Sequence, residues 1–144
     1  MFTPVHSRAS TAYRRVGADT AVPGADSHHL VHLLFEELLQ SIANARGAMA
    51  RKQIPEKCAS ISRAVSILDE GLKGGLNLSA GGELAASLNS LYGYCILQLT
   101  MANVQNDESL LVEVRALLEP VAQAWQEIRP EVSGKKAAGT ARRG

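Results

Sequence analysis

Apolar residues recur at spacings of three and four along four successive stretches of the chain, the pattern of amphipathic helices. The first stretch runs from about Ser27 to Arg51, with Asp26 or Ser27 as the expected N-cap. The second begins at Pro55, because proline suits the first helical position, and Gly74-Gly75 ends it. These two helices are therefore joined by only a few residues.

The third stretch runs from about Gly82 to Asn103, and the fourth runs from an Asn106/Asp107 cap to Ile128. Helices of about 20 residues are roughly 30 Å long. Four helices of similar length joined by short loops predict an all-α fold, an antiparallel four-helix bundle. Pro120 lies inside the fourth helix, and because the apolar pattern resumes in phase after it, we expect a kink there rather than a break.

The two ends of the chain differ from this central block. Residues 1–25 are expected to be a flexible segment with a short extra helix near Ser10–Val16, and residues 26–129 to be the bundle. Residues 130–144, rich in Gly, Lys and Arg, are expected to be a disordered basic tail. The net charge of +1 divides into +2, −4 and +3 over these parts. An acidic body does not suit a nucleic-acid groove, so we expect no nucleic-acid partner.

Composition narrows the class of protein further. The chain is 46% hydrophobic but only 4% aromatic, which favours an aliphatic interior of packed helices. Cys58 and Cys95 lie in helical apolar patterns without a C-x-x-C motif, which indicates free thiols in a reducing compartment. The start lacks the signature of a secretory signal, and no stretch approaches the roughly 20 apolar residues of a membrane span. We therefore expect a soluble, cytoplasmic protein that does not insert into membranes.

Two glycine pairs in the stretch "LKGGLNLSAGGELAASLNSLYGYC", residues 72–95, raise the question of a phosphate site. Neither Gly74-Gly75 nor Gly81-Gly82 matches a Walker loop or a dinucleotide fingerprint, and no strand precedes them. The simpler prediction is that they end one helix and start the next.

Other catalytic patterns are weak as well. His28 and His32 are one helical turn apart and could share a metal, but the Glu of H-E-x-x-H and a second ligand cluster are missing. A solvated helix start is the favoured interpretation of these histidines. No G-x-S-x-G elbow and no Cys–His pair can be assembled. We expect no enzyme, no metal and no cofactor.

The first and third helices carry more apolar residues than one core stripe needs. A helix in a four-helix core uses about three positions in seven, and both stretches exceed this proportion. The surplus indicates either an exposed partner site or a wider core covered by the N-terminal helix. The residue pattern alone leaves both interpretations open.

A set of residues along the chain forms a recognisable order: Tyr13, Ala25-Asp26-Ser27, Leu30-Val31, Leu34-Phe35, Gly81-Gly82-Glu83-Leu84-Ala85, Leu91-Tyr92-Gly93-Tyr94, Ala102-Asn103, Asp107 and Trp125. This order resembles the FliS family of flagellar export chaperones. Ser27 stands where the family has Pro, and Phe35 stands where it usually has Tyr.

The resemblance implies a cytoplasmic chaperone that binds the disordered C-terminal region of flagellin. It would prevent premature polymerisation and aid delivery to the flagellar type III export apparatus, where a component of the export gate is a further partner. The alternative is a helical adaptor or regulator that binds another flagellar export substrate. Whether the free protein is a monomer or a homodimer is left open.

The resemblance also implies a client groove and a movable cover for it. Tyr13 and Val16 are expected to belong to an N-terminal cap that occupies the groove when flagellin is absent. The candidates for the lining or floor of the groove are Leu34, Phe35, Leu38, Ile42, Leu88, Leu91, Tyr92, Cys95 and Ile96. Helical periodicity does not separate those that face a client from those that face the core.

Overall fold

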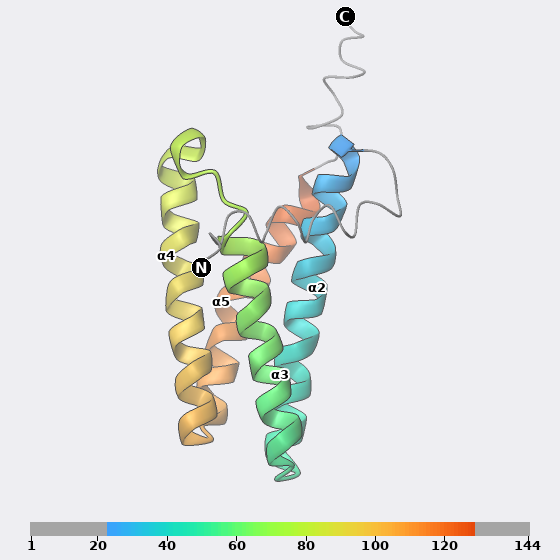
Figure 1. Ribbon diagram of the computed structural model, residues 1–144, viewed down its shortest axis with the longest axis vertical. Helices are drawn as coiled ribbons and strands as arrows, with labels where there is room; N and C mark the ends of the chain where they lie inside the picture. Colours follow the sequence, from blue (N-terminus) through green and yellow to red (C-terminus); the bar gives the residue numbers. More distant parts are fainter. Residues whose placement is uncertain (1–22, 129–144) are drawn as a thin grey trace, which may run out of the picture.

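The computed structural model describes residues 23–128, and within this range the chain is helical with no strand. The elements in order are α2 (Pro23–Ala50), α3 (Ile54–Ser66), the π-helical η1 (Ile67–Lys73), α4 (Leu78–Gln105) and α5 (Glu108–Glu127). Figure 1 shows four rods that alternate in direction, with η1 extending α3. The all-α class and the helical bundle are thus confirmed. The predicted short helix near Ser10–Val16 lies outside the described residues.

α2 begins earlier than the sequence pattern predicted. Its first residue is Pro23, so Asp26 and Ser27 lie inside the helix and the predicted N-cap was wrong. Proline is favoured at a first helical position because its φ angle is already helical and its missing amide hydrogen is not needed there. The same preference operates in α3, where Pro55 follows the first residue, Ile54.

The second helix ends as predicted at Gly74, but its last seven residues, Ile67–Lys73, form a π-helix that the sequence did not reveal. Gly71 lies in this segment and is buried against α2. A Cβ atom at position 71 would lie 3.1 Å from Leu34 Cδ1, so the absence of a side chain permits this close packing.

Gly82 produces a bend near the start of α4. Its backbone has φ 59° and ψ −140°, which only glycine adopts without strain, and the helix axis changes direction there. The helical turn from Leu78 to Gly81 therefore precedes the main part of α4. The prediction that this glycine pair separates helical segments is confirmed.

A polar cluster closes the bundle where α4 meets α5. Asp107 caps α5 by accepting a hydrogen bond from the Ser109 amide at 2.9 Å, as predicted. The Lys57 side chain, from α3, is only 2% exposed. Its ammonium donates to the Asn103 carbonyl oxygen at 2.9 Å and to the side chain of Asn106. This cation satisfies carbonyl and amide acceptors at the end of α4.

The hydrophobic core lies between the four rods and draws on every helix. Its buried members are Phe35, Leu38, Ile42, Ala45, Ile61, Ala64, Ile67, Leu68, Leu72, Tyr92, Cys95, Leu99, Ala102, Leu111, Val114 and Leu118. The interior is mostly aliphatic, as the composition predicted.

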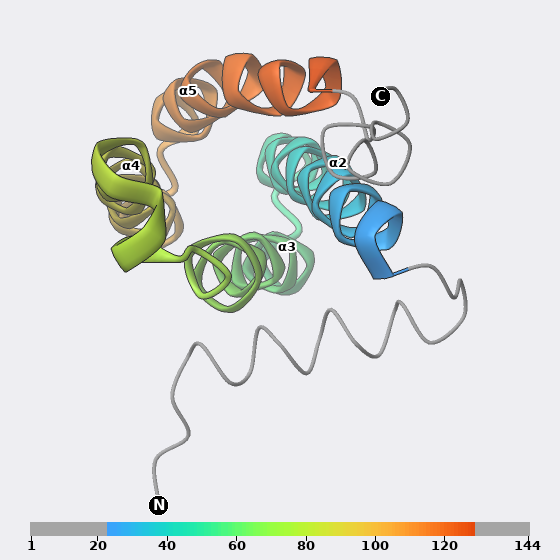
Figure 2. The same ribbon diagram turned by 90° about the horizontal axis from the view of Figure 1, so that it is seen from above.

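α5 crosses the bundle obliquely. Figures 1 and 2 show it beside α4 at the turn that joins them and beside α2 at its other end. The helix is continuous through Pro120, so this residue does not break it, and the kink expected there stays a prediction.

Trp125, near the end of α5, packs against and hydrogen-bonds to His28, near the start of α2. The two rings stack with centroids 4.8 Å apart and planes 15° apart. Trp125 Nε1 donates to the His28 carbonyl oxygen at 3.1 Å, and His28 Nε2 lies 3.0 Å from the Trp125 carbonyl oxygen. Because a carbonyl can only accept, Nε2 carries the proton in this contact.

Candidate functional site

The apolar stripe of α4 extends beyond the helices that cover it. Leu84, Leu88, Leu91, Cys95 and Leu99 follow one another at spacings of three and four on one face. Cys95 and Leu99 are fully buried, Leu88 and Leu91 are partly exposed, and Leu84 is 69% exposed. Burial therefore falls steadily toward the start of the helix. We call Leu84, Leu88 and Leu91 the open stripe.

The oblique course of α5 explains why the stripe is open. α5 covers α4 near their common turn and then diverges toward α2, where the contact between His28 and Trp125 holds it. The open stripe lies on the part of α4 that α5 has left. An exposed leucine beside half-buried ones is a place where a further apolar chain gains free energy by burial.

A second candidate surface, in addition to the open stripe, lies along α2. It is a groove of about 710 Å³ between α3 and α5, which we call the α2 groove. Its apolar lining residues, all on α2, are Leu30, Leu33, Leu34, Leu39 and Ala43, and its polar lining residues are Glu36, Glu37, Gln40, Arg63 and Arg115.

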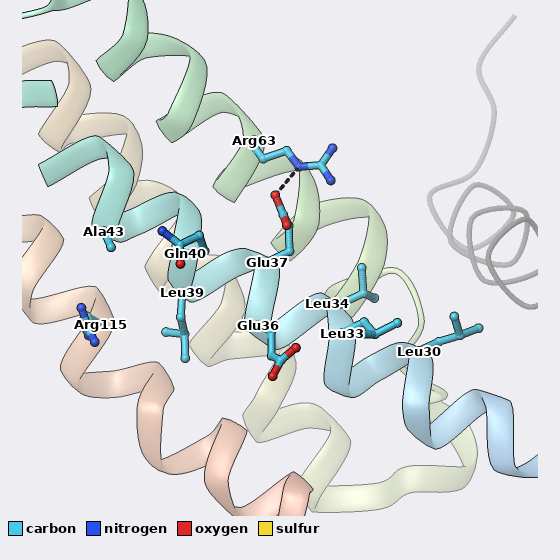
Figure 3. A pocket seen from close by; sticks show the side chains of 10 residues that line it. All are labelled: Leu30, Leu33, Leu34, Glu36, Glu37, Leu39, Gln40, Ala43, Arg63 and Arg115. Carbon is cyan, nitrogen blue, oxygen red and sulfur yellow. Dashed lines mark hydrogen bonds and ion pairs between the residues drawn. The ribbon is translucent and has the colours of Figure 1, made fainter. Parts of the chain in front are cut away.

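Figure 3 shows how the charged side chains of the α2 groove lie. Arg63 of α3 reaches over to Glu37 of α2, and their ion pair closes at 3.3 Å between Nε and Oε2. Arg115 borders the groove from α5 and pairs with Glu119 at 2.8 Å. An open groove lined by both leucines and charged side chains suits an amphipathic peptide segment better than a small polar substrate.

The structure divides the groove candidates predicted from the sequence into two sets. Phe35, Leu38, Ile42, Tyr92 and Cys95 are buried in the hydrophobic core. They support the bundle from within and are not accessible to a client in this conformation.

The remaining four candidates, Leu34, Leu88, Leu91 and Ile96, are partly exposed. Leu34 lines the α2 groove, whereas Leu88 and Leu91 belong to the open stripe. That they contact a client stays a prediction. Tyr13 and Val16, the predicted cap, lie outside the described residues.

The histidines near the start of α2 make different contacts, and the rings of His29 and His32 are stacked with centroids 6.2 Å apart. His28 is half-buried in its contact with Trp125, so its interpretation as a solvated residue was wrong. His32 Nε2 instead lies 3.2 Å from Glu36 Oε2. Within residues 23–128 no group of three or more His, Cys, Asp or Glu side chains is placed to hold a metal ion.

Both thiols are free, as predicted. Cys58 Sγ donates to the Asn103 side-chain oxygen at 3.4 Å. Burial, with a smaller contribution from Glu113, raises the pKa of the Cys95 thiol to about 11, so this sulfur stays protonated and unreactive near neutral pH.

Sequence reasoning missed the residues that make these surfaces specific. Leu84 continues the apolar pattern of α4 but was not among the predicted groove candidates, although it is the most exposed residue of the open stripe. Arg63 and Arg115 are far apart in sequence, and tertiary packing alone brings them to the two sides of α2.

An all-α bundle with apolar surface left uncovered is typical of proteins that bind segments of other chains. No helix in the described part of the chain is long and apolar enough to cross a membrane. Comparison with known proteins identifies the family to which the chain belongs. A family model described as "Flagellar protein FliS" matches residues 9–132, and the chain belongs to this family.

Several curated relatives cover nearly the whole chain. It is 45% identical over 121 residues to the flagellar secretion chaperone FliSB of Pseudomonas aeruginosa, covering 84% of this chain and 95% of the relative. It is 38% identical over 122 residues to the flagellar secretion chaperone FliS of Salmonella typhimurium, covering 85% and 90%. The FliS of Bacillus subtilis is 31% identical over 132 residues, covering 90% and 92%.

Proposed function

We propose that this chain is a cytoplasmic, non-enzymatic export chaperone that binds the disordered C-terminal region of flagellin. It keeps that region from polymerising before export and aids its delivery to the flagellar type III export apparatus. Membership of the FliS family, whose curated members are named flagellar secretion chaperones, supports the chaperone role. The structural observation that carries the proposal is the open stripe.

The mechanism rests on covering apolar surface on both partners. A client segment with one apolar face buries Leu84, Leu88 and Leu91, and burial of a single leucine contributes about 1.5–3 kcal/mol. The client loses conformational entropy when it orders, so the net affinity is smaller than the buried area suggests. The same apolar face of the client can no longer contact another client molecule.

The α2 groove offers a second apolar floor for the same client chain. It is lined by four leucines of α2, and the Arg63–Glu37 ion pair adds a carboxylate and a guanidinium to the lining. A segment that engages the groove and the stripe binds more tightly than either contact alone, because the second contact is intramolecular.

The resting state needs a cover for this surface. We propose that the segment containing Tyr13 and Val16 occupies part of the client site in the free protein and is displaced by flagellin. The binding energy measured for flagellin is then the difference between the two occupants.

Calorimetric titration of the full chain with a peptide from the C-terminal region of flagellin tests the proposal. Saturable binding with a negative heat-capacity change is expected, and a peptide from the N-terminal region of flagellin is the control that gives no heat. Absence of binding at concentrations of about 50 μM would contradict the proposal. Capture of a different flagellar export substrate as the dominant partner would instead favour an adaptor for that substrate.

A further inference from the structure

Charge is divided unevenly between the helices and the stretch of chain that follows them. Residues 23–128 have a net charge of −5, whereas residues 129–144 have a net charge of +4. We call the second stretch the basic segment, and its positive residues are Arg129, Lys135, Lys136, Arg142 and Arg143. Opposite charges of this size on one chain attract each other. The positions of the carboxylates on the helices therefore decide where the basic segment is drawn.

Carboxylates gather on the two helices that flank the start of the basic segment. Residues 23–45 of α2 and 116–127 of α5 contain no Lys or Arg, and their acidic residues are Asp26, Glu36, Glu37, Glu119 and Glu127. The start of α2 and the end of α5 lie side by side, joined by the contact between His28 and Trp125 (Figures 1 and 2). The basic segment thus begins beside an acidic surface.

A depression of about 460 Å³ lies between these two helices. We call it the α2–α5 depression, and its lining includes Phe35, Leu39, Ala122, Glu36 and Glu119. No lysine or arginine of the described chain lines it. Glu119 pairs with Arg115 at 2.8 Å, whereas Glu36 pairs with the imidazole of His32 at 3.2 Å. This mixed lining suits lysine, because its aliphatic stem packs on apolar surface while its ammonium stays near a carboxylate.

The basic segment is long enough to reach back to this depression. Lys135 is seven residues beyond Ile128, and seven extended residues span at most about 25 Å. Glu119 is nine residues before Ile128, which is about 13 Å along α5. A tether this short gives an effective concentration of about a millimolar. Charge pairs that would be weak between separate molecules can therefore hold the segment in place.

Other surfaces of the bundle attract the basic segment less. Residues 84–105, which include the open stripe, contain no Asp, Glu, Lys, Arg or His. Val132 is the one member of the basic segment from among Val, Leu, Ile, Met and the aromatic residues, so the segment has little to bury against that stripe. The turn between α2 and α3 carries Arg51 and Lys52 and repels it.

We propose that the basic segment folds back into the α2–α5 depression of its own chain, with Lys135 and Lys136 at Glu36 and Glu119. Because the pairs form between exposed charges, the contact is reversible and weakens as salt is added. Glu36 and Leu39 line both this depression and the α2 groove, so the bound segment covers one side of the groove. The contact itself does not depend on the identity of the client.

Paramagnetic relaxation enhancement on the full chain tests the contact. A nitroxide at Gly139→Cys, in a Cys58→Ser background where the buried Cys95 stays unlabelled, should broaden the backbone amide signals of Leu39 and Ala122 at about 50 mM salt. At about 500 mM salt most of the lost intensity should return, because ions screen the charge pairs. Broadening confined to the last turn of α5, or broadening that salt leaves unchanged, would overturn the proposal.

Removal of charges locates the contact. Glu36→Gln combined with Glu119→Gln should reduce the broadening at least about threefold. The matched control is Glu56→Gln combined with Glu83→Gln, which removes two exposed carboxylates from α3 and α4 and should change the broadening by less than about 1.3-fold. Equal effects of the two pairs would overturn the proposal. Broadening of a ¹⁵N-enriched chain by a separate labelled chain would assign the contact to another molecule, and would overturn it as well.

The consequence for the client rests on the proposed function. If the basic segment covers part of the α2 groove, replacing Lys135, Lys136, Arg142 and Arg143 with Ser should tighten binding of the flagellin C-terminal peptide about two- to fivefold at about 50 mM salt, and not at 500 mM. Calorimetry measures both. Equal affinities at low salt would overturn the competition. A peptide that binds neither protein would contradict the proposed function, whereas the relaxation experiment decides the contact by itself.

Discussion

At the scale of single residues, Lys57 shows how a buried charge can hold the end of a bundle together. Its ammonium is enclosed between α3 and the α4–α5 turn and has no carboxylate among its hydrogen-bond partners there. The carbonyl oxygen of Asn103 and the side-chain oxygen of Asn106 accept its hydrogen bonds instead. A buried charge is tolerated only when such partners satisfy it.

Lys57→Met should therefore lower the free energy of unfolding by about 1–3 kcal/mol, because it removes two hydrogen bonds donated by the charged ammonium, one of them to the partly buried Asn103. The exposed Lys52, changed to Met in the same way, should alter it by less than about 0.5 kcal/mol. Urea unfolding followed by circular dichroism measures both. Equal effects of the two substitutions would mean that the contacts of Lys57 contribute nothing specific.

Cys95 should react far more slowly in the folded protein than in the unfolded chain. Burial raises its pKa to about 11, so at pH 8 the thiolate is scarce, and alkylation should be at least about a hundredfold slower than in urea. The raised pKa favours the protonated thiol in the folded state. The contribution of this thiol to the free energy of unfolding is therefore present at neutral pH and is lost as the pH rises toward 11. Mass spectrometry of the Cys95 peptide gives the rate, and rapid labelling of folded protein at pH 8 would contradict this assignment.

At the scale of elements, the contact between His28 and Trp125 fixes where α5 ends and thereby which part of α4 stays open. Two hydrogen bonds and a ring stack join residues 97 positions apart in sequence. Without this contact, the last turns of α5 beyond Pro120 have fewer ties to α2. The exposure of the open stripe thus depends on an interaction at the opposite edge of the bundle.

His28→Ala should lower the free energy of unfolding by about 1–2 kcal/mol, from the lost hydrogen bond and ring stack. It should also shift the fluorescence of Trp125, the one tryptophan of the chain, toward longer wavelength as water reaches the indole. His29→Ala is the matched control, because His29 is adjacent and exposed. An unchanged emission spectrum in His28→Ala would show that the stack does not persist in solution.

The helices themselves were largely predictable, whereas their exact ends and course were not. Spacing of apolar residues located all four rods, and the Asp107 cap followed from its side-chain chemistry. The π-helix at Ile67–Lys73 contains Gly71, which packs against Leu34 of α2, a tertiary contact that no local signal encodes. The direction of α5 depends on the contact of Trp125 with His28, which is likewise a tertiary effect.

At the scale of the whole molecule, the surplus apolar residues seen in the sequence are divided between the core and the exposed surface. Phe35, Leu38 and Tyr92 turn inward and enlarge the core, whereas Leu84 and Leu97 stay exposed. Helical periodicity identified the surplus of apolar residues but could not say which of them are buried. The neighbouring helices, and not the sequence of the helix itself, decide which positions they cover. The candidate site could therefore be predicted as a set of helices and not as a set of residues.

The proposed cap makes a prediction at this scale. Replacing both Tyr13 and Val16 with Ala should weaken the resting cover and tighten flagellin binding by about three- to tenfold, because the client displaces a weaker competitor. The unfolding free energy of the bundle should stay within about 0.5 kcal/mol of the parent. Calorimetry with the flagellin C-terminal peptide measures the change. Weaker binding would show instead that these two residues contact the client.

The central claim is that the open stripe of α4 is the surface a client covers, and one comparison tests it most directly. The flagellin C-terminal peptide is titrated into Leu84→Glu and into Val112→Glu, two exposed apolar positions where a charge is expected to leave the fold intact. Leu84→Glu should raise the dissociation constant at least about tenfold, because the client would bury an unpaired carboxylate, and Val112→Glu should leave it within about twofold. Equal affinities for both variants would contradict the account.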